Sequence, residues 1–342
     1  MICENYTNIR KILLFRPHDL RDIMSFHTHK TSIEEGDTLM LYLSPSSLLT
    51  ITVNSLTKNK HGATVENILQ TTQGALKVRN LIGQKYGSRI ELSKGSAYAL
   101  HPTPELWTVT LPHRTQIIYT PDISMILFQL ELRPGCIVIE SGTGSGSLSH
   151  ALIRAIKPSG HLYTFDFHEH RASVARSEFQ SHGVGDFVTV AHQDVCQNGF
   201  GSEVERKADA VFLDLPHPWE AVPHAVNAMK DSGGRLCSFS PCMEQVQRTC
   251  EKLRGLGFVE ISTLEVLIKE YQVSARTMSV MDLDSINAND NGPNAVWKDP
   301  LKIVSCNAPL TLAGHTGYLT VATLPPLLSR VPIDSVNGTN QG

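Results

Sequence analysis

The chain has 342 residues, of which 41% are hydrophobic and 18% are charged, so it can bury a full core and a second, smaller one. Its formal net charge of −3 argues against a domain that binds nucleic acid mainly through its own positive field. The seven cysteines include no C-x-x-C pair, so no zinc site or disulfide framework has its usual spacing, and no metal is expected. The apolar run at 12–15 is too short to span a membrane, so no membrane association is expected either.

The first 112 residues are predicted to form an extension followed by a small β-domain. Residues 1–24 are expected to be disordered, and Met24 is an alternative start. From 25 to 112, short β-rich runs alternate with clusters of Gly, Pro, Asn and Ser, a pattern typical of an all-β domain. The expected strands are Leu39–Leu43, Leu48–Val53, Arg89–Leu92 and Trp107–Val109.

Beyond residue 112 the pattern changes to apolar strands that alternate with helix-period segments. This alternation is typical of a doubly wound α/β sheet covered by helices. One helix is expected at Ser147–Ile156, before Pro158, and another at Met243–Leu256, before Gly257, because proline and glycine end helices. The expected strands are Val138–Glu140, His161–Asp166, Phe187–His192, Ala210–Asp214, Arg235–Ser240 and Val259–Leu267.

The C-terminal part of this domain is expected to contain a disordered insertion. Residues 275–311 have a disorder-like composition, with a run rich in Asn from 287 to 294. Gly317–Ala322 then returns as an apolar run, predicted to be an antiparallel seventh strand that pairs with the sixth. The α/β domain would therefore comprise 113–274 and 312–325, and residues 326–342 would form a tail.

Three glycines at alternate positions, Gly142, Gly144 and Gly146, follow the first strand of the sheet, which ends in Glu140. Glycine is needed where the backbone turns sharply from strand to helix and a ligand approaches main-chain N–H groups. The spacing is G-x-G-x-G, whereas dinucleotide-binding folds have G-x-G-x-x-G. A carboxylate beside such a turn suits the positive amino group and sulfonium of S-adenosylmethionine. The pattern therefore favours that cofactor and disfavours a nicotinamide oxidoreductase.

Two further acids end the next two strands. Asp166 lies 24 residues after Gly142, where a carboxylate can accept both ribose hydroxyls. Asp194 follows the third strand, where an aspartate can accept a hydrogen bond from the adenine amino group. Parallel strands end at a common edge of the sheet, so these acids are expected to surround one ligand. The alternative is that each aspartate caps the helix that follows it.

The segment from Asp214 to Trp219 follows the fourth strand and is expected to hold the reacting group. Asp214 can accept a hydrogen bond from an adenine amino group, which moves electron density to the ring nitrogen that attacks the methyl. Trp219 either stacks on a flipped base or packs in the core under the loop. In a competing chemistry, Cys242 after the fifth strand would be the nucleophile of a cytosine-C5 RNA methyltransferase.

Six segments closely resemble the catalytic subunits of eukaryotic tRNA (adenine-58-N1)-methyltransferases and occur in that family's order. They are HPTPEL at 101–106, PHRTQIIY at 112–119, ESGTGSGS at 140–147, FLDLPHPW at 212–219, CSFSPCMEQ at 237–245 and GHTGYLT at 314–320. The resemblance covers roughly residues 36–323. It implies a Rossmann-like S-adenosylmethionine methyltransferase sheet behind an N-terminal β-domain. The implied reaction moves a methyl group from S-adenosylmethionine to N1 of adenine 58 in the T-loop of tRNA.

The motifs and the resemblance together assign roles to particular residues. Asp214 would contact the reacting base and is the expected catalytic residue. S-adenosylmethionine would be bound by Ile118, Glu140, Gly142, Gly144, Ser145, Gly146, Ser147, Asp166, Arg171, Asp194, Val195 and Asp214. Transfer RNA would be contacted by Gln116, Tyr119, Trp219, Ser238, Ser240, Pro241, Gln245, His315, Thr316 and Gly317.

The resemblance also implies partners and a location. Members of this type pair with a homologous noncatalytic tRNA-binding subunit into a heterotetramer, which would explain how an acidic chain handles a polyanion. The nucleus is the implied location, and arginines near the N-terminus give the mitochondrion as an alternative. The chain departs from the family pattern in a longer segment at 63–80 and in residues 1–24. The alternative that the chain is itself the noncatalytic subunit is opposed by its intact glycines, Asp166 and Asp214.

Overall fold

The structure, a computed structural model, describes residue 26 and residues 29–112, 114–281, 297–311 and 314–330. These residues form two compact units, one within 1–264 and 317–342 and the other within 265–316. In the described ranges, no helix is both long enough and apolar enough to cross a membrane. The predicted N-terminal extension lies outside the described residues, as do residues 331–342 of the predicted tail.

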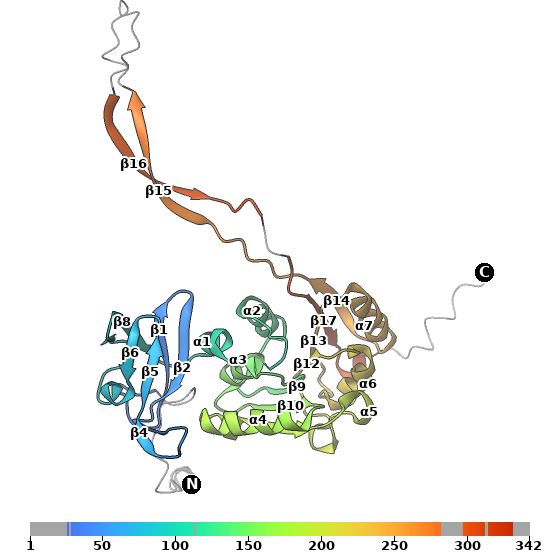
Figure 1. Cartoon of the computed structure of the whole chain (residues 1–342). Helices are drawn as coiled ribbons and strands as arrows, with labels where there is room; N and C mark the ends of the chain where they lie inside the picture. The colour runs from blue at the N-terminus through green and yellow to red at the C-terminus, as the bar shows by residue number, and fades with distance from the viewer. Residues whose placement is uncertain (1–25, 27–28, 113, 282–296, 312–313, 331–342) are drawn as a thin grey trace, which may run out of the picture. The chain divides into compact units, whose positions relative to one another are not determined.

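The N-terminal β region is built on a four-stranded antiparallel sheet with the order β2-β1-β8-β7 (Figure 1). Its strands are β1 (Thr38–Ser44), β2 (Ser47–Thr52), β7 (Arg89–Glu91) and β8 (Ser96–Leu100). Alternate residues of β1 point inward, so that Leu39 and Leu41 are fully buried in a hydrophobic cluster with Ile33 and Val53. The β-rich region predicted at 25–112 is therefore present, with its own core.

The longer segment at 63–80 is ordered and adds two small hairpins to this region. They pair β3 (Leu56–Lys58) with β4 (Thr64–Glu66), and β5 (Ile68–Thr71) with β6 (Gly74–Lys77). A 3-10 helix (Val78–Leu81) follows. Leu76, Val78 and Leu81 are buried in the same cluster as the sheet residues, so the segment is packed onto the β core.

The strand predicted at Trp107–Val109 is wrong, because these residues belong to helix α1 (Pro104–Thr110). Thr103 caps this helix by accepting a hydrogen bond from the Leu106 amide, and Pro104 occupies its first turn. A threonine cap followed by proline is a strong helix start and outweighs the β-propensity of the residues that follow. Trp107 is buried.

The α/β part contains a seven-stranded sheet with the order β11-β10-β9-β12-β13-β17-β14. All strands are parallel except β17, which is antiparallel to both β13 and β14. The predicted pairing of the seventh strand with the sixth is therefore confirmed, and the seventh also lies beside the fifth. The strands are β9 (Ile137–Ser141), β10 (His161–Asp166), β11 (Val188–His192), β12 (Ala210–Asp214), β13 (Gly234–Ser240), β14 (Val259–Leu264) and β17 (Tyr318–Leu324).

Helices cover both faces of this sheet, with α2 and α3 on one side and α6 and α7 on the other (Figure 1). The second face holds a core cluster in which Val211 and Leu236 of the sheet pack with Ala225 of α6 and Leu253 of α7. Both predicted helices are confirmed, and four more join them. The helices are α2 (Thr120–Gln129), α3 (Ser147–Ile156), α4 (Glu169–Ser181), α5 (Val195–Asn198), α6 (Pro218–Ala228) and α7 (Met243–Gly255).

The second unit is an antiparallel hairpin of β15 (Gln272–Met281) and β16 (Trp297–Asn307). The prediction that 275–311 is disordered is wrong for these strands. The composition of the Asn-rich run dominated that prediction, but the run itself, within 282–296, lies outside the described residues. On either side of it, Val and Ile residues favour extended backbone. Residues 314–316, predicted to belong to the α/β domain, belong to this unit.

Candidate active site

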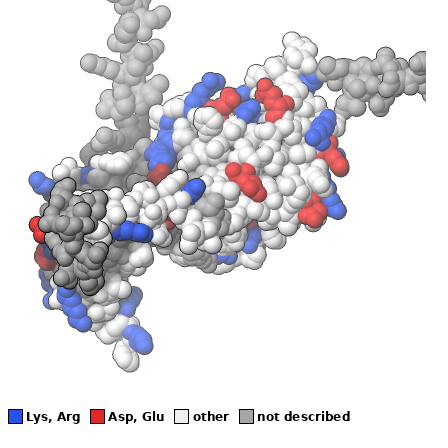
Figure 2. Space-filling model, turned by 90° about the horizontal axis from the view of Figure 1, so that it is seen from above, with Lys and Arg blue, Asp and Glu red and all other residues white. Residues whose placement is uncertain are grey.

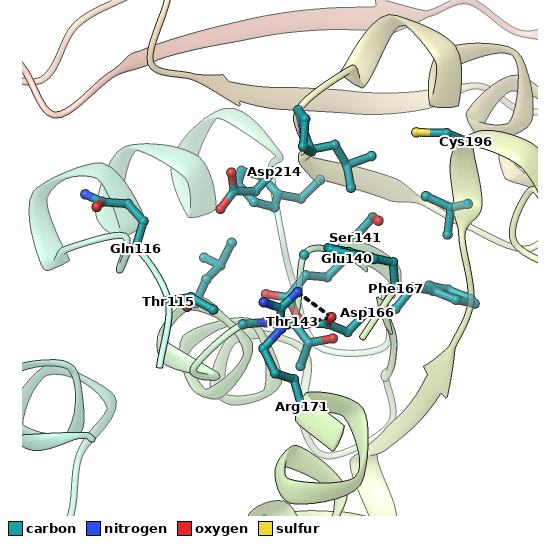
Figure 3. A pocket seen from close by; sticks show the side chains of 18 of the residues that line it. Thr115, Gln116, Glu140, Ser141, Thr143, Asp166, Phe167, Arg171, Cys196 and Asp214 are labelled. Carbon is teal, nitrogen blue, oxygen red and sulfur yellow. Dashed lines mark hydrogen bonds and ion pairs between the residues drawn. The ribbon is translucent and has the colours of Figure 1, made fainter. Parts of the chain in front are cut away.

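A cavity of about 400 Å³ lies where the carboxyl ends of β9, β10, β11 and β12 meet (Figure 3). Residues 115–118, which precede α2, complete its lining. Crevices at this edge of an open parallel sheet are the usual ligand sites of α/β folds. Of the residues predicted to bind the cofactor, the cavity is lined by Ile118, Glu140, Gly142, Gly144, Ser145, Ser147, Asp166, Arg171, Asp194, Val195 and Asp214.

The glycine-rich turn carries three positive φ angles, 100° at Gly142, 53° at Gly144 and 74° at Gly146. A Cβ atom on Gly142 would collide with the main-chain oxygen of Asp214, and one on Gly144 would lie 2.8 Å from Oγ1 of Thr115. Gly146 precedes α3 and does not line the cavity. The glycines therefore let the backbone turn tightly between β9 and α3, close beside the end of β12.

Glu140 is buried at the end of β9, below the glycine-rich turn. Its Oε2 accepts hydrogen bonds from the hydroxyls of Ser149 at 2.6 Å and Thr164 at 2.7 Å. Burial raises the pKa of this carboxyl from 4.5 to about 7. The two hydroxyl bonds join β9 to α3 and β10, so Glu140 supports the turn as well as facing the cavity.

Asp166, at the end of β10, is buried and surrounded by donors. Its carboxylate accepts the main-chain amides of Gly144 at 3.1 Å and His168 at 2.9 Å. Arg171 donates to it from Nε at 3.1 Å and from Nη2 at 2.9 Å, the ion pair drawn in Figure 3. The guanidinium of Arg171 also lies 5.1 Å from the ring of Phe167. The carboxylate is thus held in one orientation beside the glycine-rich turn.

Asp194 caps the helix that follows it and also lines the cavity. Its Oδ1 accepts the main-chain amides of Cys196 at 3.0 Å and Gln197 at 3.4 Å, so it caps α5. The residue also lines the cavity, together with Val195. The capping alternative is therefore confirmed, without removing Asp194 from the site.

Asp214, at the end of β12, differs from the other acids because its carboxylate has no hydrogen bond or ion pair with the described residues. Figure 3 shows it on the opposite side of the cavity from Asp166 and Arg171. Burial raises its pKa from 3.8 to about 6, and no nearby cation offsets this effect. It is therefore the acid of this site best placed to accept a hydrogen bond from a bound molecule.

The loop after Asp214 is held from outside the cavity by α7. Nε2 of Gln245 donates to the main-chain oxygen of Pro216 at 2.9 Å. The guanidinium of Arg248 lies 5.1 Å from the ring of Trp219, and the ring of His217 lies 5.0 Å from it. Trp219 does not line the cavity, whereas Pro216 and His217 do. The tryptophan therefore anchors the loop, and base stacking on it finds no support.

The residues predicted to contact tRNA differ in their exposure. Gln116 lines the cavity and is exposed. Ser238 and Ser240 are fully buried on β13, which lies between two other strands, so neither side chain lies on the surface of this chain. Gly317 is also buried, close to the ring of Phe239. Of the others, Tyr119, Pro241, His315 and Thr316 are exposed, and Trp219 and Gln245 are partly buried.

Several residues of the cavity were not predicted. Those that lie inside the recognised segments at 112–119, 140–147 and 212–219 had a usable signal, such as the position of Thr143 between two glycines. The rest come from segments that meet only in the folded chain, and no local pattern marks them. The residues that were missed include Thr115, Ile117, Ser141, Leu148, Phe165, Phe167, Gln193, Cys196, Gln197, Phe212, Leu215, Pro216, His217 and Glu220.

Cys242, the candidate nucleophile of the competing chemistry, is exposed at the start of α7 and does not line the cavity. Cys196 does line the cavity, but burial raises the pKa of its thiol to about 11, which keeps it protonated at neutral pH. Within the described residues, no cluster of three His, Cys, Asp or Glu side chains could hold a metal ion.

Residues 95–324 match the family model described as tRNA methyltransferase complex GCD14 subunit. The chain belongs to this family. Among similar proteins, the tRNA (adenine(58)-N(1))-methyltransferase catalytic subunit of Dictyostelium discoideum is 41% identical over 86% of this chain and 97% of its own length. The subunit of the same name from Schizosaccharomyces pombe is 41% identical over 76% of this chain and 70% of its own length. The catalytic subunit TRM61 of Cryptococcus neoformans is 44% identical over 79% of this chain, and the match covers 60% of that relative's own length.

Solved structures agree with the fold of this GCD14 family member. A SAM-dependent O-methyltransferase from Thermotoga maritima has a TM-score of 0.67 and 26% identity, and the match covers 86% of this chain and 95% of that one. The tRNA (m1A58) methyltransferase TrmI from Aquifex aeolicus has a TM-score of 0.62 and 20% identity, and the match covers 86% of this chain and 98% of that one. The predicted Rossmann-like methyltransferase sheet with an N-terminal β region is therefore confirmed.

Proposed function

We propose that this chain is the catalytic subunit of a tRNA (adenine-58-N1)-methyltransferase and transfers a methyl group from S-adenosylmethionine to N1 of adenine 58 in the tRNA T-loop. One observation carries the proposal beyond family membership. Asp214 is a half-buried acid without a partner among the described residues, and it faces a cavity beside a glycine-rich turn. A noncatalytic subunit would have no use for a desolvated carboxylate at this position.

The residues present fit S-adenosylmethionine. Glycines with positive φ remove the Cβ atoms that would otherwise fill the space beside β12. Three carboxylates, those of Glu140, Asp166 and Asp214, face the same cavity and suit a ligand with a positive sulfonium and amino group. In this proposal, Asp166 and Asp194 accept hydrogen bonds from the ribose and the adenine of the cofactor. When bound, S-adenosylmethionine supplies an electrophilic methyl group.

Asp214 can assist the reaction by accepting a hydrogen bond from the exocyclic amino group of the target adenine. With a pKa of about 6, it is ionised at neutral pH and accepts this bond as a carboxylate. The bond moves electron density to ring N1, which has a free lone pair and needs no strong base. The main work of the site is therefore to position the base and to keep water out.

Assembly with a noncatalytic tRNA-binding subunit into a heterotetramer is part of the proposal. The hairpin β15–β16 supports it, because a two-stranded ribbon cannot bury its own apolar side chains. On one of its faces Val273 is 69% exposed and Val304 is 75% exposed, and Leu301 on the other face is 55% exposed. Such side chains are usually covered by a partner.

The nucleus, with the mitochondrion as the alternative, is the proposed location and can be tested by imaging a tagged full-length chain.

The function is tested by transfer of labelled methyl from S-adenosylmethionine to unmodified tRNA, with and without the partner subunit. The proposal expects label on adenine N1, lost in Asp214→Ala and retained in Cys242→Ala. Label on cytosine that disappears in Cys242→Ala would instead establish the covalent cytosine mechanism. If the wild-type complex binds the cofactor but transfers no methyl to tRNA, the chain is not the catalytic subunit.

A further inference from the structure

The interior of the chain holds a pair of titratable side chains that the proposed reaction does not use. On the face drawn in Figure 2, Lys, Arg, Asp and Glu side chains lie at the surface. His150 of α3 and His182, which follows α4, are instead only 3% and 7% exposed. Nε2 of His150 lies 2.9 Å from Nδ1 of His182. Neither residue lines the active-site cavity, so the pair is separate from the groups that meet a ligand.

Aromatic rings enclose the pair. The ring of Phe26 lies 4.6 Å from that of His150 and 4.8 Å from that of His182. The ring of Trp107 lies 4.7 Å from His182, and that of Phe179 lies 5.1 Å from His150. Burial lowers the pKa of His150 to about 3 and that of His182 to about 4, so both imidazoles are neutral at pH 7.

The partners of the two rings fix where their hydrogens lie. Nδ1 of His150 is 2.7 Å from the main-chain oxygen of Gly146, and a carbonyl oxygen only accepts, so this nitrogen carries the hydrogen. A neutral imidazole has one N–H, so Nε2 of His150 is an acceptor and takes its hydrogen bond from the Nδ1–H of His182. The hydrogen bonds therefore run in one direction, from His182 through His150 to Gly146.

These hydrogen bonds end at the third glycine of the glycine-rich turn. Gly146 has a φ of 74° and directly precedes the first residue of α3. Its main-chain oxygen also accepts the amide of His150 at 3.3 Å, so two donors of one residue hold it. Because the peptide group is planar, the same contacts set the direction of the Ser147 amide. Ser147 lines the cavity, and the first amides of a helix have no partner within it, so the pair orients a donor beside the ligand.

The preceding residue of the turn is tied to the same end of α4. The guanidinium of Arg114 pairs with both carboxylate oxygens of Glu178, at 2.7 and 2.8 Å. The main-chain amide of Arg114 donates to Oγ of Ser145 at 3.3 Å, and its Nη2 donates to the main-chain oxygen of Ser145 at 3.4 Å. Glu178 lies four residues before His182. The C-terminal end of α4 therefore holds two successive residues of the turn, through side chains that do not line the cavity.

From this geometry we infer that His150 and His182 are positioning residues that set the glycine-rich turn for S-adenosylmethionine. They act through Gly146 and do not line the cavity, so they are not catalytic residues. Without the His150 imidazole, the Gly146 oxygen would keep only the longer bond from the helix amide. Without His182, a buried nitrogen of His150 would lose its donor, which weakens the restraint on that ring. The inference rests on the proposed function only for the identity of the cofactor.

The test measures binding of S-adenosylhomocysteine by calorimetry, in the full-length chain assembled with its partner subunit. His150→Phe keeps a ring and removes both hydrogen bonds of the imidazole, whereas His150→Asn keeps an N–H donor near the place of Nδ1. Ile153→Val is the matched control, because Ile153 is also buried on α3 and its truncation lowers stability without touching the turn. The melting temperature of each variant is measured alongside.

His150→Phe is expected to bind S-adenosylhomocysteine about tenfold more weakly, and His150→Asn to stay within about threefold of wild type. His182→Phe should weaken binding about threefold. Because the two histidines act in series, His150→Phe/His182→Phe should bind no more weakly than His150→Phe alone. The transfer rate at saturating S-adenosylmethionine and tRNA should stay within about twofold of wild type, because a bound cofactor itself holds the turn.

Wild-type affinity in His150→Phe would overturn the inference, as would a double variant whose loss is the product of the two single losses. So would an equal loss of affinity in Ile153→Val, since stability alone would then explain it. If His150→Phe does not fold, His182→Phe is compared with His182→Asn, which keeps the donor and should bind as wild type; equal losses in these two would refute the relay. Intact cofactor binding without methyl transfer to tRNA would count against the proposed function and leave this inference standing.

Discussion

Replacing Asp214 by Asn should slow methyl transfer and at the same time make the protein more stable. The carboxylate lies half-buried at the end of β12 without a cation or a hydrogen-bond donor among the described residues, and its removal from water raises its pKa from 3.8 to about 6. Ionising it in the native state at neutral pH therefore destabilises the fold by up to about 3 kcal/mol. An amide of the same shape avoids that penalty, so Asp214→Asn should raise the melting temperature by about 5 °C at pH 7.5.

The size of the stability gain from Asp214→Asn depends on pH in a way that can be checked. A carboxyl with a raised folded-state pKa stabilises the native state while protonated, below about pH 3.8, and loses that contribution as pH rises through about 6. The gain from Asp214→Asn should be full above pH 6, fall to about half by pH 5, and approach zero near pH 4. Wild-type methyl transfer should decline over the same range as pH is lowered, because the protonated acid is a poorer acceptor.

The assay is thermal unfolding of cofactor-free protein at several pH values, with Asp186→Asn as the control. Asp186 is exposed and has no ion pair among the described residues, so its replacement should change stability by less than about 0.5 kcal/mol. In single-turnover transfer, Asp214→Asn should be slower by about 100-fold. A variant that is less stable than wild type at pH 7.5, or a difference that does not change with pH, would show that the carboxylate is stabilised in the native state and refute the reasoning.

Three further substitutions test the rest of the site. Gly142→Ala places a Cβ against the end of β12 at a φ of 100° and should cost about 1–3 kcal/mol in thermal unfolding and abolish cofactor binding in calorimetry. Arg171→Met leaves a buried carboxylate without its cation, so S-adenosylhomocysteine should bind about tenfold more weakly, again by calorimetry. Arg248→Ala removes the cation over Trp219 and should lower the transfer rate about two- to fivefold without changing cofactor affinity, whereas Arg254→Ala on the same helix should do neither.

Much of the fold follows from local sequence, and the parts that do not have physical reasons. Apolar runs bounded by glycine, proline or an acid predicted the strands of the α/β sheet to within a few residues, because the central strands β9, β12 and β13 are largely buried on both faces and are therefore rich in apolar residues. The helix at Trp107 was missed because its capping threonine outweighs β-propensity. The hairpin β15–β16 was missed because composition averages over a run of Asn and hides the strands on either side.

The residues of the site also fall into some that the sequence predicted and some that it did not. Acids at strand ends were predictable, since the parallel sheet itself brings Asp166 and Asp214 to one edge. Membership of a recognised motif did not predict exposure, as Ser238 and Ser240 show: the motif continues from the loop back into β13, where both faces are covered. Residues such as Phe167 and Gln193 were missed because their place in the cavity depends on neighbours distant in the sequence.

The net charge of −3 reflects two opposite requirements on this chain. The cavity needs carboxylates for a cationic ligand, and a carboxylate kept there must be paired, as Asp166 is with Arg171, or tolerated with a raised pKa, as Asp214 is. The same negative charge opposes the approach of a polyanion. Positive charge supplied by a partner subunit would let the complex attract tRNA without neutralising the cavity of this chain. Tenfold higher salt should therefore weaken tRNA binding by the complex far more than it weakens cofactor binding in the enclosed cavity.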